Sequence, residues 1–133
     1  MEMTCPCCSG QPFAVCCEPI LKGTQPAGTA EALMRSRYTA YVKADVAYLL
    51  QSTHPSQRKY YSAKDLLQWA TSSQWLRLEI LSTQKGQGTD LEGKVEFKAY
   101  YVDNKAWSQI HHEHSTFKKE GGKWYFVEGR LKQ

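Results

Sequence analysis

The sequence has 133 residues, of which 41% are hydrophobic and 12% are aromatic, so it can bury a core and is too apolar for a disordered chain. Its formal net charge is +4, from 17 basic and 13 acidic residues, which is a smaller excess than nucleic-acid-binding domains usually carry. We therefore expect one folded domain with a small appendage, and nucleic-acid binding is the weakest of three functional hypotheses for it.

No stretch of the sequence approaches about 18 consecutive apolar residues, so no membrane span is predicted. Cysteines, Pro6 and Gly10 stand where a secretory signal has its apolar region, which predicts a cytoplasmic protein. Thiols stay reduced in the cytoplasm, and a cysteine cluster there indicates a metal or redox site rather than a disulfide staple.

All the cysteines lie in the segment CPCCSGQPFAVCC, residues 5–17. They are Cys5, Cys7, Cys8, Cys16 and Cys17. Four thiolates can surround a divalent metal tetrahedrally, and all-sulfur sites favour Zn²⁺, with iron as the alternative. Such a site has no open coordination position, so we expect a structural metal that stabilises a segment too short to bury a core.

Redox-active thiols and a disulfide staple are the alternatives for this cluster. Adjacent cysteines such as Cys16 and Cys17 bond to each other only with strain. Thiol–disulfide enzymes usually carry Cys-x-x-Cys at the start of a helix. Both observations favour metal over the two alternatives.

Three helices are predicted after a turn-rich N-terminal segment. Their sequences are TAEALMRSRYTAYVKAD from Thr29, VAYLLQST after Asp45, and SAKDLLQWATS from Ser62. Thr29, Asp45 and Ser62 are residue types that cap helix N-termini. In the first helix Met34, Tyr38, Tyr41 and Val42 recur with helical spacing, and they predict one buried stripe.

Four strands are predicted in the second half of the sequence. The runs 75–84, 92–102, 106–118 and 123–130 are separated by the turn segments GQGTD, VDNK and KEGGK. In the second run Val95, Phe97 and Ala99 alternate with polar residues, so one face is buried. Short connections predict an antiparallel meander, and the whole pattern predicts an α+β domain with helices on one face of a four-stranded sheet.

The cysteine segment resembles the SEC-C motif, a metal-binding knuckle also found at the C-terminus of the preprotein translocase motor SecA. The usual form of this motif is Cys-Pro-Cys-Gly-Ser-Gly, a short spacer with an aromatic residue, and Cys-Cys or Cys-His. The resemblance implies Cys5, Cys7, Cys16 and Cys17 as the metal ligands. It places Cys8 where the motif has glycine, and we expect the Cys8 thiol to point away from the metal.

The segments GTQPAGTAEALMRSRYTAYVKADVAYLLQSTHPSQR and HEHSTFKKEGGKWYFVEGR resemble the uncharacterised bacterial YchJ-like family, and the resemblance covers almost the whole sequence. Members of that family are similar in fold to nuclear transport factor 2, in which a curved sheet wraps over helices around a cone-shaped cavity. We therefore expect a knuckle and linker at residues 1–26 and a cone domain at residues 27–133. The resemblance to the SecA tail implies a protein partner that binds the knuckle.

The histidine-rich segment HHEHS, residues 111–115, falls in the third predicted strand. Alternation places His112 and His114 on the outer face and Glu113 on the inner face with Phe117. A buried carboxylate needs a partner, and Arg35, Arg37 and Arg58 are the candidates. Glu113 is then either half of a buried ion pair or a ligand-binding or catalytic group.

His54 and Arg58 lie in HPSQR, at the end of the second predicted helix. His54 there either interacts with the helix dipole or acts as a general base at the mouth of the cone. The tyrosines and tryptophans are expected in the core or as cavity lining. No nucleophile–base motif, phosphate loop or dinucleotide fingerprint is present, so the sequence predicts an adaptor protein first. A cone that binds or converts a small molecule through Glu113, His54 and arginines is the second hypothesis.

Overall fold

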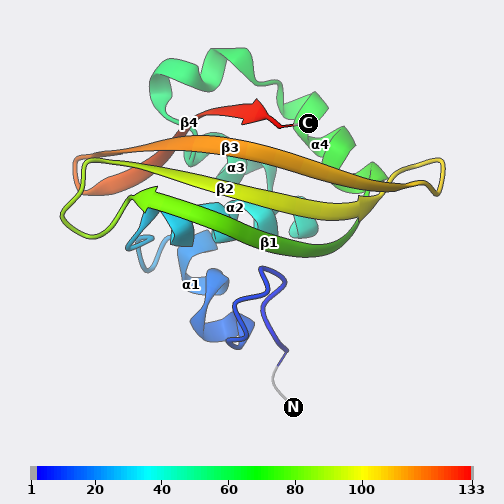
Figure 1. The fold of residues 1–133 in the computed structure, drawn as a ribbon, viewed down its shortest axis with the longest axis horizontal. Helices are drawn as coiled ribbons and strands as arrows, with labels where there is room; N and C mark the ends of the chain where they lie inside the picture. Colours follow the sequence, from blue (N-terminus) through cyan, green and yellow to red (C-terminus); the bar gives the residue numbers. More distant parts are fainter. Residues whose placement is uncertain (1–2, 133) are drawn as a thin grey trace.

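Helices and an antiparallel sheet form two layers in the computed structural model, which describes residues 3–132 (Figure 1). The helical elements are η1 (Phe13–Val15), α1 (Cys17–Leu21), α2 (Ala30–Lys43), α3 (Val46–Gln51), η2 (Pro55–Tyr60) and α4 (Ala63–Ser72). The strands are β1 (Gln74–Lys85), β2 (Glu92–Val102), β3 (Ser108–Glu120) and β4 (Lys123–Leu131), in the spatial order β1-β2-β3-β4. The predicted succession of helices and then a four-stranded meander is confirmed.

The predicted helix starts are confirmed by their side-chain caps. Thr29, Asp45 and Ser62 each accept a hydrogen bond from the backbone N–H three residues later, at 3.0, 3.1 and 3.3 Å. These bonds satisfy N–H groups that have no partner within the helix. Ala44 ends α2 in the left-handed conformation, with φ of 56°, and turns the chain directly into α3.

The core lies between α2 and the inner face of the sheet. On β2, Val95, Phe97 and Ala99 are buried, as their alternation predicts, and Phe117 of β3 is fully buried beside them. Leu33, Met34 and Tyr38 of α2 cover these side chains. Of the predicted stripe, Met34 and Tyr38 are buried, whereas Tyr41 and Val42 are only partly buried. The sheet therefore presents one face to the helices and the other to solvent.

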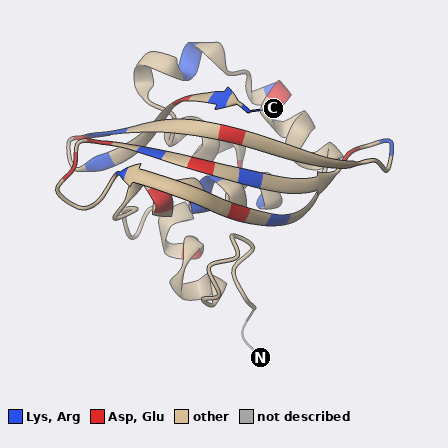
Figure 2. Cartoon of the chain, viewed as in Figure 1, with Lys and Arg blue, Asp and Glu red and all other residues tan. Residues whose placement is uncertain are grey.

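Charged residues of both signs are interspersed along the four strands (Figure 2). Several of them pair across strands. The Arg77 guanidinium lies 3.8 Å from the centre of the Tyr100 ring, and the Tyr100 hydroxyl donates to Glu79 at 2.8 Å. This mixed surface differs from the continuous basic stripe that a nucleic-acid backbone would attract.

Two segments differ from the sequence-based expectation. The third strand begins at Ser108 rather than at residue 106, because the Asp103 carboxylate accepts hydrogen bonds from the N–H groups of Lys105 and Trp107 and closes a turn there. The segment 1–26, expected to be a turn-rich knuckle and linker, also contains the short helices η1 and α1 within its described part. Within residues 3–132, no helix combines the length and apolar character needed to cross a lipid bilayer.

Candidate functional site

The thiols of Cys5, Cys7, Cys16 and Cys17 form one cluster, in which all four sulfur atoms lie within 4.8 Å of one another. The Sγ atom of Cys16 is 3.6 Å from that of Cys7 and 4.0 Å from that of Cys17. A tetrahedral zinc site with zinc–sulfur bonds of about 2.3 Å has sulfur atoms about 3.8 Å apart. The donor set and its spacing therefore fit a four-coordinate metal ion.

A short hairpin and a helix start bring the two cysteine pairs together. The N–H of Cys5 donates to the carbonyl of Gln11 at 2.8 Å, and Thr4 pairs with Pro12 in an antiparallel bridge. Gly10 turns the chain between them with φ of 85°, a conformation that favours glycine. The second pair follows η1, and its Cys17 is the first residue of α1.

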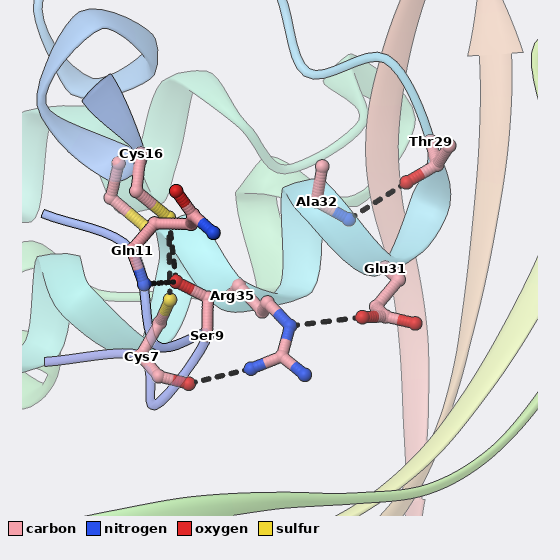
Figure 3. Close-up of polar contacts among 9 residues, drawn as sticks. Cys7, Ser9, Gln11, Cys16, Thr29, Glu31, Ala32 and Arg35 are labelled. Atoms are coloured by element: carbon pink, nitrogen blue, oxygen red, sulfur yellow. Dashed lines mark hydrogen bonds and ion pairs between the residues drawn. The ribbon is translucent and has the colours of Figure 1, made fainter. Parts of the chain in front are cut away.

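Polar groups of the knuckle and of α2 surround the cluster (Figure 3). The Ser9 hydroxyl lies 3.1 Å from Sγ of Cys16, and the buried Thr39 hydroxyl lies 3.8 Å from Sγ of Cys5. Arg35 of α2 donates from Nη1 to the carbonyl of Cys7 at 2.7 Å and from Nε to Glu31 at 2.9 Å. α2 thus fixes the position of the knuckle and places a positive charge beside the thiols.

The thiols differ in acidity although they share one cluster. A hydrogen bond from Cys17 lowers the pKa of the Cys7 thiol to about 4, and that bond is also the main reason why the pKa of Cys17 is raised. Burial raises the pKa of Cys16. The arrangement therefore favours a thiolate at Cys7, and thiolates are the form in which cysteine binds metal.

Cys8 lies outside this cluster. It is exposed, and its backbone has φ of 66°, the left-handed conformation that explains why the motif usually has glycine there. Its Sγ atom contacts the carbonyl of Pro6 and accepts from the N–H of Leu78 on β1, both at 3.5 Å. Cys8 therefore touches the edge of the sheet and contributes no sulfur to the cluster.

We expect Cys8 to be the first thiol modified when the metal-loaded protein is treated with a limiting amount of alkylating agent. It is exposed, whereas Cys5, Cys7 and Cys17 are buried. Peptide mass spectrometry measures the order of labelling. Earlier labelling of Cys5 or Cys17 would contradict this expectation, and Cys8→Gly should leave the metal content unchanged.

The structure does not bring Glu113 and His54 into one cavity, so the expected cavity lined by both residues is wrong. Glu113 lines a partly open cavity with Arg37, whereas His54 and Arg58 lie outside its lining. His54 caps η2 by accepting from the N–H of Ser56, and its other ring nitrogen contacts Glu120.

Arg58 performs the helix-end role that the sequence suggested for His54. Its Nε donates to the carbonyls of Leu50 and Thr53, and its Nη2 donates to the carbonyl of Gln51, all at 3.0 Å. Carbonyls at the end of a helix have no partner within the helix, so a guanidinium there is stabilising. His54 lies beyond the last turn of α3 and instead starts the next element.

Glu113 is bonded by neighbours on its own strand rather than by an arginine, which corrects the predicted partner. His111 Nε2 lies 2.9 Å from one carboxylate oxygen, and the Ser115 hydroxyl donates to the other. Both residues are two positions from Glu113, so their side chains lie next to it on the same face of β3 and are closer to it than any arginine. Arg35 instead binds the knuckle, and Arg37 binds the end of α3.

Gly129 on β4 makes room for the Glu113 carboxylate, a role that the sequence did not reveal. A Cβ atom built on Gly129 would overlap the carboxyl group. Gly129 is the strand partner of Ser115 on β3, and this pairing places it directly beside the Glu113 carboxylate. A glycine in a strand marks this kind of close approach.

We expect Gly129→Ala to lower the free energy of unfolding by about 1–3 kcal/mol, because the added methyl group must push the partly buried Glu113 carboxylate away from its hydrogen-bond partners His111 and Ser115. Gly88→Ala is the matched control, since nothing lies within 4 Å of its added Cβ atom. Its effect should stay within about 0.5 kcal/mol. Chemical denaturation measures the free energy of unfolding of both variants. Equal losses would contradict the close contact between Gly129 and the Glu113 carboxylate.

Glu113 should also make stability dependent on pH. Burial raises the pKa of this carboxyl, but the hydrogen bonds from His111 and Ser115 outweigh burial and hold the pKa below its usual value. The stabilisation is therefore complete above the unfolded-state pKa of about 4.3 and is lost as the pH falls through the lower folded-state pKa. The difference in unfolding free energy between wild type and Glu113→Gln should shrink from about pH 6 to about pH 3. A constant difference would contradict this assignment.

Comparison with known proteins finds relatives that match both the α+β domain and almost the whole chain. The family model described as "YchJ, middle NTF2-like domain" matches residues 29–129. A UPF0225 protein of Geobacter sulfurreducens is 47% identical over 129 residues, which cover 97% of this chain and 80% of that protein. One from Photorhabdus laumondii is 43% identical over 130 residues, covering 97% and 81%.

Two solved structures share the fold and the motif named in their descriptions. A SEC-C motif containing protein from Rhodopseudomonas palustris has a TM-score of 0.90 at 37% identity, covering 98% of this chain and 100% of that one. A second, from Psychrobacter arcticus, has a TM-score of 0.81 at 31% identity, covering 98% and 84%. The chain therefore belongs to the YchJ-like UPF0225 family of SEC-C motif proteins.

Proposed function

We propose that Cys5, Cys7, Cys16 and Cys17 hold one zinc ion whose role is structural. The observation that carries this proposal is the spacing of their sulfur atoms, all within 4.8 Å of one another. Four thiolates fill a tetrahedral coordination sphere, and no position is left for a substrate or water. The ion then ties the N-terminal hairpin to the start of α1.

Zinc and iron give different results in a direct test. Elemental analysis of the purified protein should give one zinc per chain, and the zinc-loaded protein should show no visible absorption, because zinc has filled d orbitals. Iron in place of zinc would retain the four-thiolate site but overturn the metal assignment. A chain without bound metal after purification under reducing conditions would overturn both.

We also propose that the knuckle and the cleft beside it bind a protein partner. The cleft has a volume of about 590 Å³ and lies between the segment that follows the knuckle, α3 and the β3–β4 turn. Lys22, Arg58 and Lys123 supply positive charge, and the part of the chain that the structure describes contributes no acidic residue to the lining. Ile20 and Leu21 add apolar surface. This combination suits an acidic segment with apolar side chains.

The partner proposal is tested by capturing proteins from bacterial extract with wild type and three variants. Cys17→Ser removes the metal, Lys22→Glu with Lys123→Glu reverses the charge of the cleft, and Lys94→Glu with Lys98→Glu reverses charges elsewhere as the control. We expect the same partner to be retained by wild type and control and to be lost by the other two variants. An unchanged set of captured proteins after loss of metal and of cleft charge would contradict the adaptor function.

A further inference from the structure

A partly open cavity of about 150 Å³ lies between the inner face of the sheet and helices α2 and α4. Aromatic rings form much of its wall. Trp69 packs on Tyr41 and Trp75, with ring centroids 5.0 and 5.3 Å apart. Packed rings of this kind make a rigid apolar surface, and their faces attract cations.

Arg37 brings a positive charge to one side of this cavity. The residue is only 5% exposed, and its Nη1 donates to the carbonyl of Leu49, to Ser52 and to Thr53, at 2.9, 2.7 and 3.2 Å. Its guanidinium carbon lies 4.4 Å from the centre of the Phe126 ring, another wall residue. Within residues 3–132, Nε and Nη2 have no hydrogen-bond partner. A buried guanidinium therefore has N–H donors left for a ligand.

Glu113 brings a negative charge to the same cavity. Its two carboxylate oxygens contact His111 and the Ser115 hydroxyl, and a carboxylate has about four acceptor positions in total. No ion pair joins Glu113 to Arg37 among the described residues, although both line one cavity. Each charged group is anchored by its own neighbours, so the two are held apart instead of neutralising each other directly.

We propose that this cavity binds a small zwitterion of the amino-acid type, with its carboxylate on Nε and Nη2 of Arg37 and its ammonium group against Glu113. A guanidinium binds a carboxylate through two parallel hydrogen bonds, and the aromatic wall stabilises the ammonium end. When His111, which also lines the cavity and bonds Glu113, is neutral, the charges of Arg37 and Glu113 cancel, so a ligand with a net charge would leave an unbalanced charge at the site. The volume also limits the ligand, since a cavity of about 150 Å³ accommodates a molecule of about the size of benzene.

The ligand class is tested with three probes of similar shape on the wild-type protein. Valine carries both charges, isobutylamine lacks the carboxylate, and isovalerate lacks the ammonium group. Titrations followed through the tryptophan indole N–H signals report on Trp69 and Trp75 in the wall. We expect saturable shifts with valine and with smaller amino acids, and binding at least about tenfold weaker with either one-ended probe. No saturable shift with any of the amino acids, or equal binding of isobutylamine, would overturn the proposal.

A pair of variants tests the role of Glu113. Glu113→Gln keeps the shape of the side chain but removes the charge, and it should weaken valine binding by about tenfold or more. Glu96→Gln is the control, because Glu96 lies on the outer face of β2 and pairs with His112 at 2.7 Å. The spectrum of each variant shows whether it is folded. Equal valine affinity of the folded Glu113→Gln and Glu96→Gln proteins would overturn the proposal, and the probe series on wild type is an independent test.

Discussion

Replacing Cys17 by serine is expected to abolish stoichiometric metal binding and to destabilise the N-terminal segment by about 3 kcal/mol or more. Cys17 is 1% exposed and is the first residue of α1, and its Sγ atom lies 4.0 Å from that of Cys16. Serine is a poor ligand for a sulfur-selective site, so the hairpin and α1 would lose the ion that joins them. Elemental analysis measures the loss of metal, and amide hydrogen exchange of the knuckle measures the loss of local stability.

Cys8→Ser is the matched control for this experiment. It removes a thiol from the same segment, but the Cys8 side chain is exposed and lies outside the sulfur cluster. We expect one metal ion per chain and unchanged exchange rates in the knuckle. Loss of metal in Cys8→Ser, or full retention of metal in Cys17→Ser, would contradict the proposed ligand set.

The second large effect is expected for Arg37→Met, which should lower the free energy of unfolding of the whole domain by about 3 kcal/mol. The Arg37 guanidinium is the shared donor to the carbonyl of Leu49, to Ser52 and to Thr53 at the end of α3. Methionine fills a similar volume but leaves these buried acceptors without that donor, and it removes the contact with the Phe126 ring. Denaturant titration at neutral pH measures the change.

Arg58→Met is the matched control for Arg37→Met, because it removes a guanidinium that also bonds to the end of α3 but is exposed rather than buried. Arg58 also donates to carbonyls near the end of α3, but it is exposed, and water can replace it. We expect a loss of about 1 kcal/mol or less for this variant. If both substitutions cost the same, burial of the Arg37 network would not be the cause of its effect.

The features predicted correctly from the sequence are those set by neighbouring residues. Thr29, Asp45 and Ser62 cap helices because each lies three residues before an N–H group that needs an acceptor. The alternation of Val95, Phe97 and Ala99 identifies the inner face of β2 in the same way. The spacing of the cysteines likewise predicted a cluster, and the structure brings the four expected sulfur atoms together.

The features that the sequence did not predict depend on contacts between distant segments. Gly129 leaves space for the Glu113 carboxylate only because β3 and β4 pair in one particular register. Sequence patterns do not determine that register. Thr39 and Arg35 reach the knuckle because α2 packs beside it, and nothing in the local sequence indicates that packing. Arginine was the expected partner of Glu113, since charge suggested it, but two nearer side chains on the same strand take that place.

X-ray absorption at the zinc edge of the purified protein tests the central claim of a four-thiolate metal site most directly. The measurement reports the type and distance of the atoms bound to the metal. We expect a coordination shell of sulfur alone, with four sulfur atoms at zinc–sulfur distances of about 2.3 Å. A nitrogen or oxygen atom in that shell, or fewer sulfur atoms, would contradict the assignment of Cys5, Cys7, Cys16 and Cys17 as the complete ligand set.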